Sequence, residues 1–100
     1  MSVLMTMRVE GDTAAFRQFL ETGADRLRRI RDAAQAAGCV HHRFGVGDGY
    51  VLVVDEWESA EQFQRFFQTN PDLPEVMREA GARSEPEITF TEAVSSPDEF

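Results

Sequence analysis

The chain has 100 residues, of which 42% are hydrophobic and 28% are charged, and its formal net charge at pH 7 is −8. This length supports one core, and it predicts a single domain over residues 1–94 followed by a C-terminal tail over residues 95–100. No apolar run approaches the roughly 20 residues needed to span a bilayer, which argues against a membrane partner. The negative charge argues against nucleic acid, whose binders neutralise phosphates with clustered Lys and Arg.

The basic residues and the cysteine narrow the possible chemistry. All 10 basic residues are arginine, which excludes Schiff-base chemistry and other mechanisms that need lysine. The arginines from Arg26 to Arg31 lie between Asp25 and Asp32 in a helical pattern, so we interpret them as a solvated face. Cys39 is the only cysteine and is interpreted as a core residue. Without a disulfide or a recognisable secretory signal, we expect a cytoplasmic protein.

The first third of the chain predicts a strand followed by helix. From Val3 to Glu10, every second residue is apolar, the period of a half-buried strand. Asp12 can serve as the N-cap of a helical pattern that continues to Gly38. Gly23 lies near its middle, where glycine costs about 1 kcal/mol relative to alanine. We therefore expect a short helix followed by a longer one.

Two further strands are predicted around a tight turn. The segments Cys39 to Val46 and Tyr50 to Trp57 flank Gly47-Asp48-Gly49, whose glycines suit the positive φ angles of such turns. A turn centred on Asp48 sets the antiparallel register, and a shift of one residue would change every pair. The predicted pairs are Val46 with Tyr50, Phe44 with Leu52, His42 with Val54, and His41 with Asp55.

The remaining segments predict two helical stretches and a last strand. Ser59 with Gln62, and Asp72 with Glu75, have the spacing of capping boxes, and a strand is predicted from Ile88 to Val94. The order strand, helix, strand, strand, helix, strand predicts a ferredoxin-like α+β fold, with a four-stranded antiparallel sheet and helices on one face. Because the other face would expose apolar residues unless a second copy covered it, we expect a homodimer.

The hairpin and the residues after it carry a family resemblance. The strand Val51-Leu52-Val53-Val54-Asp55-Glu56-Trp57-Glu58-Ser59 runs directly into Ala60-Glu61-Gln62-Phe63, and the hairpin is entered through Gly38-Cys39-Val40. With an acid two residues before a Trp, then Ser, then helix, the chain resembles an antibiotic biosynthesis monooxygenase (ABM)-type domain of the dimeric α+β barrel superfamily. The resemblance covers nearly all of the chain and implies a dimeric α+β barrel. Relatives include cofactor-independent oxygenases, haem-degrading enzymes and members with no known reaction.

The haem-degrading relatives have characteristic residues that this chain lacks. They place an Asn on the first strand, a Trp within the second helix and a haem-ligating His further along. Here the first strand has no Asn, Phe66 stands nearest to that Trp, and Val76 and Met77 occupy the region of that His. Neither binds ferric iron as imidazole does. We therefore expect no haem, and we expect a reaction without any cofactor.

The cofactor-independent relatives imply a pocket between sheet and helices, where polar groups deprotonate a phenolic substrate whose carbanion reacts with oxygen. The residues able to take such parts here are His41, His42, Tyr50, Asp55, Trp57 and Asn70. We select His41, His42 and Asp55 as candidate catalytic residues, because a carboxylate across the strand would orient an imidazole as general base. The alternatives are a surface charge pair for His41 and a core position for His42. Adjacent strand residues point to opposite faces, so no metal site is expected between the two histidines.

The candidate ligand-binding residues are Phe44, Tyr50, Trp57, Phe63, Phe66 and Phe67. The three helical phenylalanines equally suit a helix packed on a sheet. Two functions remain open: a cofactor-independent monooxygenase acting on a small aromatic (phenolic, polyketide or quinol-like) compound, or a non-catalytic dimeric module binding a small aromatic molecule or a protein. The first requires a ligand-sized cavity containing His41 or His42, whereas the second is compatible with a filled core.

Overall fold

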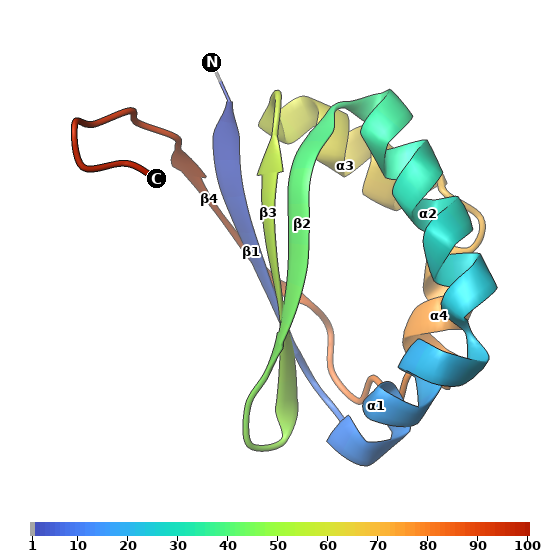
Figure 1. Cartoon of the computed structure of the whole chain (residues 1–100). Helices are drawn as coiled ribbons and strands as arrows, with labels where there is room; N and C mark the ends of the chain where they lie inside the picture. The colour runs from blue at the N-terminus through green and yellow to red at the C-terminus, as the bar shows by residue number, and fades with distance from the viewer. Residues whose placement is uncertain (1) are drawn as a thin grey trace.

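The computed structural model describes residues 2–100, and its elements follow the predicted order (Figure 1). The strands are β1 (Val3–Glu10), β2 (Cys39–Val46), β3 (Tyr50–Trp57) and β4 (Glu87–Glu92), and the helices are α1 (Thr13–Thr22), α2 (Ala24–Ala37), α3 (Ala60–Thr69) and α4 (Leu73–Glu79). The sheet is open and antiparallel, with strand order β2-β3-β1-β4. The helices lie on one face of it (Figure 1). The predicted ferredoxin-like α+β fold is confirmed.

The predicted division of the first helical pattern is also confirmed. The carboxylate of Asp12 accepts hydrogen bonds from the backbone N–H groups of Ala14 and Ala15, at 3.0 and 3.1 Å, and so begins α1. The chain breaks between α1 and α2 at Gly23, where an added Cβ would clash with the ring of Phe19. A glycine is therefore required by close packing at this corner.

The two predicted capping boxes form only in part. The Ser59 hydroxyl accepts from the Gln62 backbone N–H at 3.1 Å, as predicted, but the Gln62 side chain turns away and donates to the Ala37 carbonyl at 3.2 Å. The predicted cap by Asp72 is wrong. Its backbone is already helical, and its carboxylate pairs instead with Arg29 at 3.2 Å, which offers a charged donor. The last strand begins one residue earlier and ends two residues earlier than predicted.

The hairpin register differs from the prediction by one residue. Gly47 donates its backbone N–H to the Tyr50 carbonyl at 2.9 Å, which leaves Asp48 and Gly49 as a two-residue turn with φ 81° at Gly49. The turn is therefore centred between these residues and not on Asp48. The four predicted pairs are wrong, and the observed ones are Val46 with Val51, Phe44 with Val53, His42 with Asp55, and His41 with Glu56.

The two faces of the sheet have different surroundings. The face toward the helices carries Met5, Val53 and Trp57, which form the buried core with Phe63 of α3. The opposite face is not covered by any helix (Figure 1), and Leu4 and Val54 are each 44% exposed there. The segment after β4 extends away from the helical layer (Figure 1). No helix within residues 2–100 combines the length and hydrophobicity required to cross a membrane.

Candidate functional site

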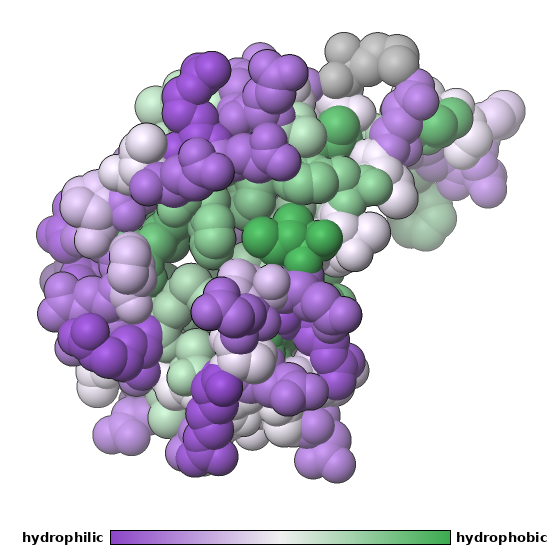
Figure 2. Space-filling view, turned by 180° about the vertical axis from the view of Figure 1, so that it is seen from behind, coloured by the Kyte–Doolittle hydropathy of each residue, from purple (hydrophilic) through white to green (hydrophobic). Residues whose placement is uncertain are grey.

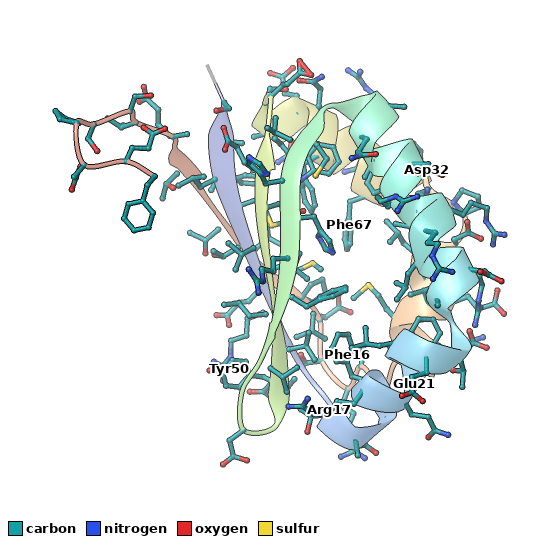
Figure 3. All side chains as sticks on the ribbon, viewed as in Figure 1. Phe16, Arg17, Glu21, Asp32, Tyr50 and Phe67 are labelled. Atoms are coloured by element: carbon teal, nitrogen blue, oxygen red, sulfur yellow. The ribbon has the colours of Figure 1, made fainter. Side chains whose placement is uncertain are left out.

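A cavity of about 700 Å³ lies between the sheet and the helices. It shares part of its wall with the core, since Met5, Val53 and Trp57 line both. Figure 3 shows Phe16 of α1 and Phe67 of α3 pointing into the space between the two layers. From behind, hydrophobic side chains are visible between polar surfaces (Figure 2). The volume lies in the range of pockets that bind small organic ligands, roughly 300–1,000 Å³.

Asp55 is the buried charged residue on the wall of this cavity, with a side chain only 6% exposed. One carboxylate oxygen, Oδ1, lies 2.7 Å from Nδ1 of His42, and the other, Oδ2, accepts a hydrogen bond from the indole N–H of Trp57 at 2.9 Å. A carboxylate removed from water requires such donors, because each unpaired oxygen would cost free energy. The strand places these donors: Trp57 lies two residues further along the same face, and His42 lies directly opposite.

His42 lines the same cavity as the carboxylate that it contacts. Its ring packs edge-on against Phe44, with ring centres 4.7 Å apart, and its side chain is 45% exposed. An ionised carboxylate can only accept, so the short contact assigns the hydrogen of a neutral imidazole to Nδ1. Nε2 then carries the lone pair, and no residue within 2–100 forms a hydrogen bond with it. This nitrogen can accept a proton from a bound molecule.

The other selected residues fall on both faces of the sheet. The aromatic side chains that line the cavity are Phe44, Trp57, Phe63, Phe66 and Phe67. Tyr50 does not join them, because it lies on the open face of the sheet (Figure 3). The guanidinium of Arg8 lies 3.6 Å from the centre of its ring. His41 lies opposite Glu56, next to a register shift in β2, and it also lines the cavity. The pair predicted for His41 and Asp55 is therefore formed by His42.

Three polar residues of α2 that were not selected from the sequence also line the cavity: Arg28, Arg31 and Gln35. They lie beside the apolar stripe of Leu27, Ile30 and Ala34 on the same helix. The sequence signal was their spacing of three and four residues, which places them on one side of a helix. In a helix with four arginines between two acids, that signal cannot be distinguished from a solvated face.

Cys39 packs against the core at the start of β2. Burial, together with the negative charge of Asp55, raises the pKa of its thiol to about 11. The thiolate is the nucleophilic form of cysteine, and it is scarce at neutral pH when the pKa is this high. This arrangement agrees with a packing role for Cys39.

No protein-family model matches the sequence, and no curated protein matches it either. Solved structures do share its fold. A monooxygenase from the gene ActVA-Orf6 of Streptomyces coelicolor, in complex with nanaomycin D, superposes with a TM-score of 0.67 at 16% identity, covering 95% of this chain and 89% of that one. SnoaB, a cofactor-independent oxygenase from Streptomyces nogalater, gives a TM-score of 0.59 at 16% identity and covers 98% of both chains.

A third solved structure with this fold is a dimeric ferredoxin-like protein from an uncultured marine organism. Its TM-score is 0.64 at 17% identity, and the match covers 95% of this chain and 90% of that one. At these identities the likeness shows the fold alone. The chain has the fold of ABM-type ferredoxin-like proteins, which is what the resemblance of its hairpin predicted.

Proposed function

We propose that the protein is a cofactor-independent monooxygenase acting on a small aromatic compound of phenolic, polyketide or quinol-like type. The observation that carries this proposal is the contact of 2.7 Å between His42 and buried Asp55 on the wall of an apolar cavity of about 700 Å³. It supplies a candidate base beside a space that fits a polycyclic ring system. Two solved structures with this fold bear names of oxygenases.

In the proposed reaction, His42 takes a proton at Nε2 from an activated CH₂ group of the bound ring system. The carbanion passes one electron to O₂ and combines with the resulting superoxide, which gives a hydroperoxide after protonation. Loss of the second CH₂ hydrogen as a proton, with cleavage of the O–O bond, yields a carbonyl and water. The net change is CH₂ plus O₂ to C=O plus H₂O. Asp55 stabilises the imidazolium, and the apolar walls exclude water from the carbanion.

We further propose that the protein acts as a homodimer joined through the open face of the sheet. Leu4 and Val54 expose apolar surface on that face, and exposed apolar area of this kind is typical of interfaces. One solved structure with the same fold is described as dimeric. The cavity lies on the helical side of the sheet, so a second copy on the open face would leave it accessible.

A matched pair of histidine variants tests the catalytic proposal. The wild-type protein is given a panel of anthrones, naphthoquinols and other polycyclic phenols, and oxygen uptake is recorded. For an accepted compound, His42→Gln is expected to lower kcat by about 10² to 10⁴, the usual contribution of a general base. His41 also lines the cavity but does not pair with Asp55, so His41→Gln is expected to lower kcat far less than His42→Gln does.

Binding controls separate the outcomes of this experiment. Circular dichroism checks that both variants fold, and quenching of the fluorescence of Trp57 reports ligand binding. An unchanged rate in His42→Gln would remove this imidazole from the mechanism. Saturable quenching without oxygen uptake across the panel would instead favour the alternative, a non-catalytic module that binds aromatic molecules.

A further inference from the structure

The four arginines of α2 divide into two pairs according to what they contact. Arg26 forms an ion pair with Glu79, and Arg29 forms one with Asp72 at 3.2 Å. These partners lie at the two ends of α4. The first pair of arginines therefore connects α2 to α4 and has a structural role.

Arg28 and Arg31 form the second pair, and both line the cavity together with Gln35. We refer to these three residues as the basic rim. The ion-pair partners of the two arginines are Asp25, at 2.8 Å, and Asp32, at 3.0 Å, both on α2 itself. Exposed pairs between neighbours on one helix contribute little and exchange readily with other partners. The basic rim can therefore accept a ligand group without disrupting a contact between elements.

The charges around the cavity contrast with the net charge of the protein. The chain carries a formal charge of −8, yet its cavity is lined by three arginines, Arg28, Arg31 and Arg43, and by only two acids, Asp12 and Asp55. The two acids are already engaged, since Asp12 caps α1 and Asp55 holds His42 and Trp57. Arg28 and Arg31 are paired only with exposed carboxylates of α2, so a ligand group can replace these partners more readily than it can those of the two acids.

We propose that the substrate carries a carboxylate, which binds Arg28 and Arg31 while its aromatic rings occupy the apolar cavity. Two guanidinium groups one helical turn apart suit the two oxygens of a carboxylate, and the Gln35 amide adds a further donor. Fixing the substrate at one end would also limit how the rings lie relative to His42. This inference rests on the proposed function, which gives the substrate its aromatic ring system, and it adds a carboxylate to that ring system.

The test compares two ligands that share one ring system and differ at one substituent, the charged anthraquinone-2-carboxylate and the neutral anthraquinone-2-carboxamide. Each is titrated into the protein while Trp57 fluorescence is followed with correction for the inner-filter effect. The carboxylate is expected to bind about tenfold more tightly, as charge-assisted hydrogen bonds imply. The preference should shrink as salt is raised. In the double variant R28Q/R31Q, both ligands should bind with the affinity of the amide.

The control is the double variant R17Q/R65Q, which changes the net charge equally at two arginines that do not line the cavity. It is expected to keep the preference for the carboxylate. Equal affinities in the wild type, or a preference retained by R28Q/R31Q, would overturn the inference.

Oxygen uptake separates this inference from the proposed function. A carboxylate preference that depends on the basic rim, without uptake for any anthrone, would support the inference and overturn the proposed reaction. Equal kcat/KM values for an anthrone carboxylic acid and its amide would overturn the inference and leave the reaction in place.

Discussion

Asp55 shows how one buried residue can determine the state of its neighbour. Both of its oxygens accept a hydrogen bond, one from His42 and one from Trp57. The indole fixes the orientation of the carboxylate, and the carboxylate in turn fixes the tautomer and orientation of the imidazole. Asp55 is thus a positioning residue in the proposed reaction, since it acts through His42 and not on the substrate itself.

The substitution Asp55→Asn tests this positioning role. The amide of Asn presents one oxygen and one NH₂ group to two neighbours that both donate, so either the bond to Trp57 is lost or His42 must take the other tautomer. With a proton on Nε2, the imidazole cannot act as base. We expect kcat to fall at least about a hundredfold while KM and the quenching of Trp57 change little. Stability should fall by about 1–3 kcal/mol in urea unfolding. A variant that loses binding and rate in equal measure would contradict a positioning role.

The raised pKa of Cys39 predicts how the stability of the protein changes at alkaline pH. Its pKa is raised in the folded protein from an ordinary value of 9.0 to about 11. Below pH 9 the thiol keeps its proton in both states, so its contribution to stability is complete. Between about pH 9 and pH 11 the unfolded chain loses the proton first, and this contribution falls as the pH rises. Urea unfolding of the wild type and Cys39→Ala across this range should show the stability difference changing in favour of the variant. A constant difference would contradict the raised pKa.

At the scale of elements, the bounds of the hairpin strands could be predicted from the sequence but their register could not. Along β3 both alternating sets contain apolar side chains, Val51 and Val53 in one and Leu52 and Val54 in the other. Hydrophobicity alone therefore does not decide which set faces the helices. The turn offers glycines on both sides of Asp48, so two turn centres are compatible with the sequence. The predicted pair of His41 with Asp55 is wrong for this reason, because the observed register places His42 opposite Asp55.

The contacts between helices illustrate a second limit of sequence reasoning. Gly23 marks a break that any helical pattern would reveal, because glycine weakens a helix wherever it stands. The different roles of Arg28 and Arg29 could not be predicted in the same way. Both are exposed arginines in one run, and only the position of α4 makes one a structural contact and leaves the other beside the cavity. Such a division depends on tertiary packing, so it becomes visible only in the folded chain.

At the scale of the whole molecule, the proposed ligand binding and the proposed dimerisation use opposite faces of the sheet. The helical face holds the cavity. The open face holds the apolar side chains that a second copy would cover. If both proposals are correct, association and ligand binding can be disrupted independently, because the sheet lies between the two surfaces.

The substitution Val54→Glu tests this separation. It places a charge at an exposed apolar position of the open face, and burying an unpaired charge in an interface is costly. Light scattering at micromolar concentration should give the wild type twice the mass of the chain and the variant the mass of one chain. Ala36→Glu adds the same charge to an exposed position of α2 and should remain dimeric. Because the cavity lies on the helical side of the sheet, a polycyclic phenol that the wild type accepts should still quench the Trp57 fluorescence of Val54→Glu. A monomeric wild type would contradict the dimer, and a variant that is folded and monomeric but unable to bind would show that the cavity depends on the second copy.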